Sequence, residues 1–370
     1  MKIMFLAVGW ENLAIEYLSA ILKKNGFDTA LCYDPSLFDD KYYFDLKYLA
    51  RLFSIRKILL KQIIDYSPDL IAISVFTQNY IWAKSMIKEI KKIKDIKVIL
   101  GGVHPTILPE LTLNDSAADF ICVGEGDIAL PLFCAALRDN KDISDIPNIW
   151  MKRDNKIIAA SQSAPLINNL DDLPLPDKTL FKKYVNIQDV YMILTSRGCI
   201  HNCSYCGAGA LQNLIIKKNE NYNIKYYRRR SVENVIAELE YAKKEFNIKT
   251  VNFVDNIFTL EKNWTLTFLE EYRKKINLPF RCLTYPNNLD DDIAKSLKIS
   301  KCYQISIGVQ SLDETVRKKI LNRNISNTII FETFKILEKN KLNYNVDHIL
   351  GIHTENFDAH LKALIIYSDY

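Results

Sequence analysis

The first third of the chain alternates short apolar runs with segments whose apolar residues recur at helical spacing. Apolar runs predict strands at residues 3–8, 28–33, 70–75, 97–100 and 119–123, and amphipathic segments predict helices at 12–25, 54–66, 80–94 and 127–138. Short buried strands that alternate with such helices are typical of a doubly wound parallel sheet. We therefore expect a flavodoxin-like (Rossmann-like) α/β domain over residues 1–140.

The α/β pattern restarts at residue 190, after a stretch of different character. Residues 141–189 carry two proline-bearing clusters around a hairpin-like segment at 148–160, and the absence of a Gly/Ser tract predicts a packed linker. Beyond it, strands are predicted at 190–195, 249–254, 280–284, 303–308 and 344–350, and helices at 231–246, 263–275, 290–298, 313–321, 326–340 and 357–368. Residues 190–370 are thus expected to form a barrel or part-barrel whose functional loops follow the strands.

Composition excludes several classes of protein. Of 370 residues, 48% are hydrophobic and 25% charged, as in ordinary globular proteins, and a net charge of +5 gives nucleic-acid binding little support. No apolar stretch approaches the ~18 residues of a membrane span. The apolar run after Met1 is too short for a signal sequence. We expect a cytoplasmic protein with no nucleic-acid partner and no membrane span.

Glycine is scarce, which makes its positions informative. There are 11 glycines, and we expect each to stand where the backbone requires glycine, either for a positive φ or for a close approach to a ligand. Gly26 fits the C′ cap of a helix. The others fall at or just beyond the ends of predicted strands, where α/β proteins bind ligands.

Three of the eight cysteines share one loop. Cysteines 32, 122, 134, 282 and 302 lie inside predicted elements, where a small thiol usually fills the core. Cys199, Cys203 and Cys206 instead form a C-x3-C-x2-C loop directly after a strand. Such a loop can bind three irons of a cubane and leave the fourth iron open. Zinc with His201 as fourth ligand is the alternative, but zinc loops usually supply a second cysteine pair, and none follows.

This loop resembles the cysteine motif of the radical SAM superfamily, and further motifs follow it in family order. They are Val254-Asp255-Asn256 after the second strand, Ser306 to Ser311 in the fourth, the helix ending in Asn322-Arg323, and Asp347 to Glu355 after the fifth. The last departs from the family pattern with His353 for Pro and Thr354 for Gly. The resemblance implies that Cys199, Cys203 and Cys206 bind a [4Fe–4S] cluster, and that SAM is bound by Tyr205, Gly207, Asp255, Asn256, Ser306, Gln310, Arg323 and Gly351.

The N-terminal domain resembles the cobalamin-binding domain that precedes many radical SAM domains. The similarity rests on the segments around residues 11–13, 74–80, 101–106 and 124–126. It implies cobalamin contacts from Asn12, Ser74, Thr77, Gln78, Gly101, Gly102, His104, Gly124, Glu125 and Gly126. The D-x-H-x-x-G motif of an axial histidine is absent, so we expect cobalamin without histidine ligation from below and His104 at the pocket edge. A domain that keeps the fold without binding cobalamin is the alternative.

Together the resemblances imply a cobalamin-dependent radical SAM enzyme. The cluster would cleave SAM to methionine and a 5′-deoxyadenosyl radical, and methylcobalamin would methylate an unactivated carbon of a small-molecule or lipid-like substrate. Electrons would come from a flavodoxin- or ferredoxin-type donor. One alternative is a radical SAM cyclase or oxidoreductase, and another is a non-catalytic cobalamin- or cluster-binding sensor. A methylthiotransferase is disfavoured because its second cluster needs three cysteines in N-terminal loops.

The second domain contains one strand fewer than the six-stranded part-barrel that its family generally forms. Five strands are predicted, followed by the helix at 357–368. We expect an edge strand and a helix whose apolar side is partly exposed. On this basis the chain is expected to be a truncated or split family member. Turnover of the natural substrate would then require the missing piece or a partner chain.

Overall fold

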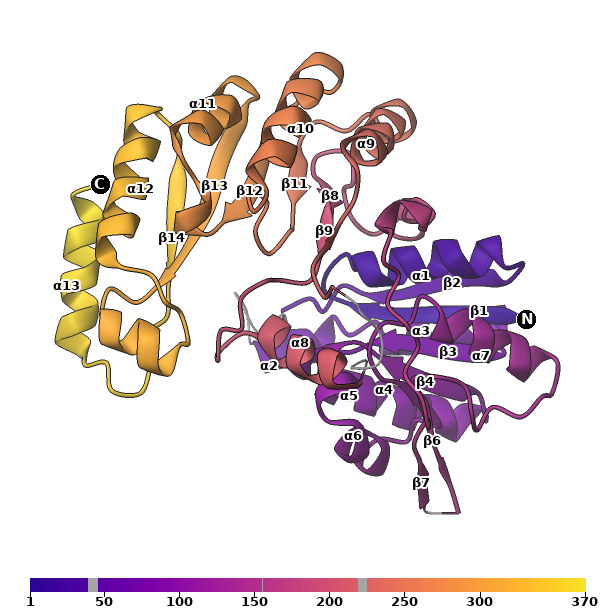
Figure 1. Cartoon of the computed structure of the whole chain (residues 1–370). Helices are drawn as coiled ribbons and strands as arrows, with labels where there is room; N and C mark the ends of the chain where they lie inside the picture. Colours follow the sequence, from indigo (N-terminus) through magenta and orange to yellow (C-terminus); the bar gives the residue numbers. More distant parts are fainter. Residues whose placement is uncertain (39–45, 155, 219–224) are drawn as a thin grey trace. The chain divides into compact units, whose positions relative to one another are not determined.

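The structure is a computed structural model that describes residues 1–38, 46–154, 156–218 and 225–370 (Figure 1). The chain divides into two compact units. The first holds Met1–Ile167, Asp172–Asn186 and a short segment that begins at Leu214, and the second begins at Asn168–Asp171 and continues with Ile187–Asn213 and Lys225–Tyr370. The stretch 141–189, which the sequence set apart as a linker, therefore folds largely with the first unit.

The first unit is built on a seven-stranded sheet of order β2-β1-β3-β4-β5-β6-β7. The parallel strands are β1 (Lys2–Val8), β2 (Asp28–Asp34), β3 (Leu70–Ser74), β4 (Lys97–Gly101) and β5 (Phe120–Cys122). The hairpin β6 (Ile149–Arg153) and β7 (Lys156–Ile158) adds to β5 in antiparallel orientation. The order β2-β1-β3-β4-β5 is that of flavodoxin-like folds, as predicted: successive strands are added first on one side of β1 and then, from β3 onward, on the other, while β1 and β3 remain parallel.

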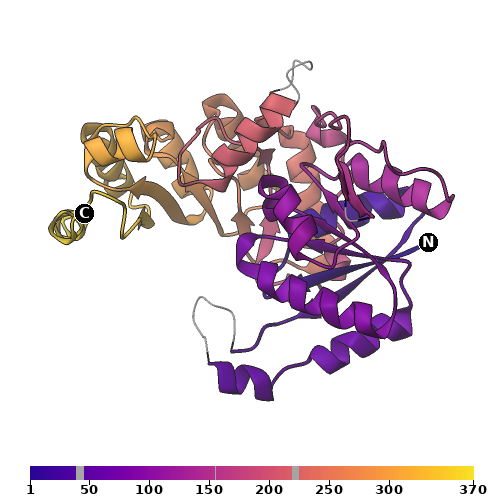
Figure 2. The same cartoon turned by 90° about the horizontal axis from the view of Figure 1, so that it is seen from below.

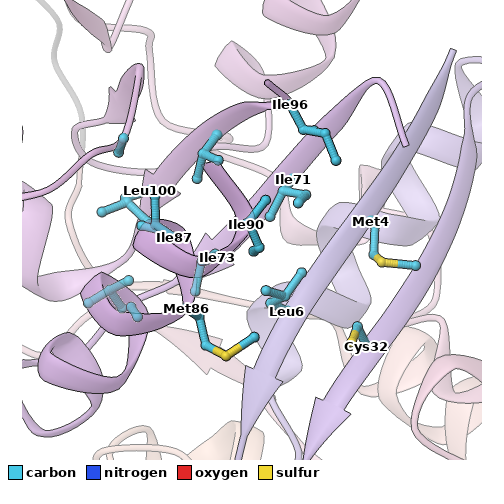
Figure 3. Close-up of a cluster of buried hydrophobic side chains, with 14 of the residues drawn as sticks. Met4, Leu6, Cys32, Ile71, Ile73, Met86, Ile87, Ile90, Ile96 and Leu100 are labelled. Atoms are coloured by element: carbon cyan, nitrogen blue, oxygen red, sulfur yellow. The ribbon is translucent and has the colours of Figure 1, made fainter. Parts of the chain in front are cut away.

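Helices cover both faces of this sheet, because alternate side chains of its strands are apolar on each side. Helices α3 (Arg56–Tyr66) and α4 (Tyr80–Ile93) bury Leu59, Met86 and Ile90 against one face, as Figure 3 shows for α4. Helix α1 (Leu13–Lys24) lies beside α7 (Ala129–Arg138). Asn12 caps α1 by accepting a hydrogen bond from the Ile15 N–H, and Gly26, at φ +79°, follows its C-terminus. Helices α2 (Lys47–Leu52), α5 (Val103–Ile107) and α6 (Pro109–Asp115) were not predicted.

The second unit contains a parallel sheet of five strands among the described residues, in the order β14-β13-β12-β11-β8. The strands are β8 (Tyr191–Ile193), β11 (Val251–Phe253), β12 (Phe280–Thr284), β13 (Cys302–Gln310) and β14 (Tyr344–His348). All five coincide with predicted strands. Helices α9 (Val232–Phe246), α10 (Lys262–Lys275), α11 (Asp291–Ile299), α12 (Asn327–Lys339) and α13 (Phe357–Ser368) follow in chain order. Figures 1 and 2 show this row of helices along the sheet.

Two smaller elements frame the cysteine loop of the second unit. Strands β9 (Ser196–Arg197) and β10 (Arg228–Arg229) form an antiparallel ribbon, and helix α8 (Gly207–Lys218) starts immediately after Cys206. At the other end of the unit, Tyr367 of α13 packs edge-on against Phe334 of α12, with ring centroids 6.2 Å apart. The predicted exposure of the α13 apolar side is confirmed, since Phe357 is 67% and Ile365 59% exposed. No helix among the described residues is long and apolar enough to cross a membrane.

Candidate functional site

The three loop cysteines lie between β9 and α8 in a tightly folded turn. Cys203 is buried, whereas Cys199 and Cys206 are partly exposed. The turn depends on Gly198, which has φ +85°, because a Cβ there would lie 2.4 Å from the carbonyl oxygen of Tyr226. A side chain at this position would push the loop away from the residues that precede β10.

A second segment of the same unit holds this loop in place. The Ser204 N–H donates to the Leu321 carbonyl over 3.2 Å, and the Ser204 hydroxyl donates to the Ile320 carbonyl over 2.5 Å. The Asn322 side-chain amide donates to the Asn202 carbonyl over 2.7 Å. The fold thus fixes the loop from outside, through contacts that the cysteine spacing does not reveal.

Arg323 completes this segment and lies directly against the loop. Its Nη1 is 3.9 Å from the Cys203 Sγ and donates to the Tyr205 hydroxyl over 3.2 Å. Its Nη2 donates to the carbonyl of Gly308 in β13, and its guanidinium lies 4.1 Å from the centre of the Tyr285 ring. One buried cation therefore joins the cysteine loop to β13, the strand that carries the motif Ser306 to Ser311.

The local environment affects the titration of these groups. Burial raises the pKa of Cys199, while the N–H of His201 and the charge of Arg323 oppose this shift. Burial also raises the pKa of Tyr205 to about 12 and lowers the pKa of His201. The neutral His201 ring stacks on Tyr285 at 4.3 Å.

Among the described residues, no three His, Cys, Asp or Glu side chains lie close enough together to hold one metal ion. A [4Fe–4S] cubane takes its cysteine ligands on separate irons, whereas a tetrahedral zinc ion takes all of its ligands on one centre.

The motif Val254-Asp255-Asn256, which follows β11, contacts the residues that lead into the cysteine loop. Asp255 is fully buried, and its carboxylate accepts hydrogen bonds from the Thr195 N–H at 3.1 Å, the Thr195 hydroxyl at 2.9 Å and the Ser196 hydroxyl at 2.5 Å. The Asp255 carboxylate is therefore already hydrogen-bonded to Thr195 and Ser196 of the protein itself. Asn256 is exposed and donates to the Gly198 carbonyl over 3.0 Å. The motif therefore braces the chain on the N-terminal side of Cys199.

The remaining residues predicted to bind SAM belong to β13, to the turn after β14 and to the start of α8. Ser306 donates to the Asn345 side chain of β14 over 3.0 Å, and Gln310 ends β13 at φ +74°. Gly351 follows β14 at φ +84° with open space beside it, and Gly207 is the first residue of α8. Arg323 brings Tyr205 to the Gly308 end of β13. Sequence reasoning assigned no role to Ser204 or Tyr285, and it marked Asn322 only as part of the Asn322-Arg323 motif.

The first unit has a cavity of about 450 Å³ at the carboxyl ends of β1 and β3. This is the position where the strand order reverses, and such switch points bind ligands in doubly wound folds. Its lining combines amides and hydroxyls with exposed apolar side chains, namely Val8, Gly9, Trp10, Glu11, Asn12, Ser36, Arg56, Phe76, Gln78, Asn79, Ile81, Trp82 and Ser85. Trp10 is 57% and Ile81 80% exposed, so the cavity has an apolar rim open to a ligand. Asn12 and Gln78 were predicted, and the others were missed.

Other residues predicted to contact cobalamin lie nearby in the same unit. Gly124 and Glu125 line a smaller hollow with Thr106, whose hydroxyl accepts from the Gly124 N–H over 2.9 Å. Ser74, Gly101 and Gly102 belong to the β3 and β4 ends, and a Cβ on Gly102 would lie 2.9 Å from the Val75 carbonyl and 3.3 Å from the Ser74 hydroxyl. Gly126 packs against Leu18.

His104 does not lie where the sequence placed it. It is buried rather than at a pocket edge, because its ring stacks on Tyr80 at 4.1 Å and its Nδ1 pairs with the Thr77 hydroxyl at 3.2 Å. Burial lowers the pKa of His104, which favours the neutral ring. The buried His104 thus holds the turn after β3 through its contacts with Thr77 and Tyr80.

Comparison with known families finds one match in each half of the chain. The family model "B12 binding domain" matches residues 6–133, and the model "Radical SAM superfamily" matches residues 193–364. The chain belongs to the cobalamin-binding radical SAM enzymes. The cofactors of this family are a [4Fe–4S] cluster, S-adenosylmethionine and cobalamin.

Individual relatives support the same family. An uncharacterized methyltransferase of Pyrococcus horikoshii is 27% identical over 259 residues, which cover 68% of this chain and 54% of the relative. Cytidylyl-2-hydroxyethylphosphonate methyltransferase of Streptomyces wedmorensis is 22% identical over 390 residues, covering 93% of this chain and 68% of that protein. The radical SAM methyltransferase TsrM of Kitasatospora setae shares the fold, with a TM-score of 0.78, 16% identity, and coverage of 99% of this chain and 71% of that one. The chain thus spans about half the length of the Pyrococcus relative.

Proposed function

We propose that this chain carries the cofactor-binding core of a cobalamin-dependent radical SAM methyltransferase that acts on a small-molecule substrate. The observation that carries the proposal is the Arg323-supported loop of Cys199, Cys203 and Cys206 at the carboxyl edge of a parallel sheet. The match to the B12 binding domain and the cavity at the switch point of the first unit support cobalamin as a further cofactor. Methyltransferases among the relatives favour methylation over other radical chemistry.

The chain's residues fit the cluster and SAM. Two of the three thiols are partly exposed and the third is buried beside a guanidinium, so the loop can present thiolates to a ligand while Arg323 offsets part of their charge. The side-chain Nε of Arg323 is buried without a hydrogen-bond partner in the structure, which leaves one donor for a carboxylate. The role assigned to the eight SAM residues remains part of this proposal.

The cavity of the first unit fits a large, mostly flat macrocycle with amide arms. Trp10, Phe76 and Ile81 supply apolar contact area, and Asn12 and Gln78 supply hydrogen-bonding groups. Gly9 has no atom within 4 Å of its missing Cβ, so backbone and ligand can approach each other there. Among the described residues, no histidine is in the lining of this cavity. Binding without histidine ligation from below is part of this proposal.

When bound, the cluster and SAM supply a 5′-deoxyadenosyl radical and methylcobalamin supplies a methyl group. The chain's own contribution is placement. Asp255 and Asn256 fix the entry to the cysteine loop, Asn322 and Ser204 fix its middle, and the Tyr285 ring covers the Arg323 guanidinium. We further propose a flavodoxin- or ferredoxin-type electron donor. We also propose a reducing cytoplasmic setting, since all eight cysteines are free thiols.

Anaerobic reconstitution with iron, sulfide, hydroxocobalamin, SAM and a strong reductant tests the proposal. We expect an iron–sulfur absorption band, stoichiometric cobalamin, 5′-deoxyadenosine release, and a product in cell extract that is heavier by about 14 Da, the mass of one added CH2. Colourless protein with stoichiometric zinc would contradict the proposal. SAM cleavage without a heavier product would favour a cyclase or oxidoreductase, and cobalamin binding without SAM cleavage would favour a sensor.

A further inference from the structure

A buried ion triad lies next to the cavity of the first unit. The Lys178 Nζ is 2.6 Å from the Glu11 Oε1 and 2.9 Å from the Glu16 Oε2. The side chains of Lys178, Glu11 and Glu16 are 1%, 9% and 0% exposed. Lys178 starts a short 3-10 turn, Lys178–Leu180, in the stretch that the sequence assigned to a linker. Nothing in the cysteine, glycine or motif pattern indicated this contact, which spans 167 residues of sequence.

The triad is costly to bury and therefore calls for a role other than stability alone. Removing charges from water costs several kcal/mol per ion, and apolar residues of similar volume often stabilise a core at least as well. Two carboxylates also share one ammonium here. Burial raises the pKa of Glu16 well above its ordinary value, and Glu11 adds to this while Lys178 opposes it. Burial favours the neutral amine of Lys178, yet the two carboxylates raise its pKa.

Glu11 connects the triad to the cavity. It lines the cavity together with its neighbours Trp10 and Asn12, in the loop between β1 and α1. The remaining residue of that loop, Gly9, accepts a 2.7 Å hydrogen bond through its carbonyl from the Tyr33 hydroxyl. The Tyr33 ring in turn packs on Phe181 and Tyr184.

The segment 176–184, which we call the strap, thus contacts Glu11 of this loop through Lys178, and it contacts Tyr33 of β2 through Phe181 and Tyr184. Besides Lys178 and the two aromatic rings, Asp177 of the strap accepts from Ser19 over 2.7 Å and pairs with Lys23 at 2.6 Å. Ser19 and Lys23 belong to α1. The strap therefore contacts both the loop, at Glu11, and helix α1, which follows the loop.

We propose that Lys178 is a positioning residue for the cobalamin site, because its contact with Glu11 sets the loop 9–12 so that Trp10 and Asn12 line the cavity. This inference rests on the proposed function of the first unit. Lys178 itself does not line the cavity, so it acts through the loop and not by touching the cofactor.

Hydroxocobalamin titration of the full chain tests this role. Lys178→Met leaves Glu11 and Glu16 facing each other without a cation, and we expect it to weaken hydroxocobalamin binding by at least about tenfold and to shift the visible bands of the bound cofactor. Lys183→Met removes the same charge from an exposed site on the strap, and its affinity should stay within about twofold of wild type. Phe133→Leu opens the buried core of the same unit away from the strap. It should lower the thermal midpoint and leave affinity and spectrum unchanged.

A double variant separates the lost contact from repulsion between the two carboxylates. Glu11→Gln in the Lys178→Met background removes that repulsion without restoring the contact, so the double variant should keep the weakened affinity and the shifted spectrum. Recovery of affinity in the double variant would overturn the positioning role. Wild-type protein that binds hydroxocobalamin, together with a Lys178→Met variant of equal affinity and spectrum, would overturn the positioning role alone. Wild-type protein that binds no hydroxocobalamin would overturn the proposed function and this role with it. A loss of affinity in Phe133→Leu as large as in Lys178→Met would reduce Lys178 to a structural residue.

Discussion

Arg323 lies against Cys203, with Nη1 and Sγ 3.9 Å apart, although 120 residues separate them in the sequence. The same guanidinium reaches Tyr205 and the Gly308 carbonyl. Iron is bound by thiolates, and the guanidinium would offset part of the negative charge that three thiolates bring to this loop. The arginine therefore links the electrostatics of the cysteine loop to the strand that is expected to hold SAM.

Removal of this cation should impair SAM cleavage more than folding. Arg323→Met loses both hydrogen bonds and the charge, and we expect the rate of 5′-deoxyadenosine release to fall by at least about tenfold. Lys318→Met, an exposed site in the same segment, should retain the wild-type rate. Equal rates in Arg323→Met and wild type would show that the guanidinium serves only the fold.

The loop cysteines should be distinguishable from the core cysteines by iron content. Cys199→Ala, Cys203→Ala and Cys206→Ala each remove one expected cluster ligand, so reconstituted protein should lose most of its iron and its absorption band. Cys134→Ala changes a buried thiol of α7 and should keep both. Iron retained by all three loop variants would exclude a cluster at this loop.

Gly198 allows a test of the loop geometry without any change to a cysteine. Gly198→Ala combines a φ of +85° with a Cβ 2.4 Å from the Tyr226 carbonyl, and we expect it to destabilise the second unit by about 2 kcal/mol or more and to reduce iron content. Gly26→Ala has a similar φ of +79° but no atom within 4 Å. It should cost only about 1 kcal/mol in the free energy of unfolding, as measured by denaturant titration.

Much of this arrangement follows from local sequence signals, and the rest depends on contacts between distant residues. The strands were predictable because their apolar runs are buried on both faces, as in β1, where Ile3 to Ala7 are all buried. Helix α2 was missed because none of its residues is buried, so no apolar periodicity marks it. His104 was placed at a pocket edge because a strand-end position does not reveal which side chain stacks over it.

The cavity was only partly predictable for a related reason. Asn12 and Gln78 were expected from the resemblance to the cobalamin-binding domain, and both follow strands at the switch point, where doubly wound sheets bind ligands. Arg56, Trp82 and Ser85 belong to helices α3 and α4, and only packing on the sheet brings them to the same cavity. Lys178 reaches the neighbouring loop from a segment whose prolines indicated no more than a packed connection.

The apolar rim of the cavity should contribute directly to cobalamin affinity. Trp10→Ala removes an exposed aromatic side chain, so we expect weaker hydroxocobalamin binding by about tenfold with little change in thermal midpoint. Tyr48→Ala provides the control, because Tyr48 is 81% exposed in the same unit and does not line the cavity. Unchanged affinity in Trp10→Ala would place the cofactor elsewhere.

The stability of the first unit should depend on pH through Glu16. Because burial raises the pKa of Glu16 in the folded chain, the unfolded chain releases this proton first, at about its ordinary value of 4.5. The free energy of unfolding should therefore fall as pH rises from 4.5 to the raised pKa, while Lys178, whose pKa is also raised, keeps its charge throughout. Glu16→Gln mimics the protonated carboxyl and should flatten this decline, whereas Glu110→Gln, an exposed site of the same unit, should not. Thermal midpoints measured at about pH 5 and pH 8 check the prediction, and identical pH dependence in wild type and Glu16→Gln would contradict it.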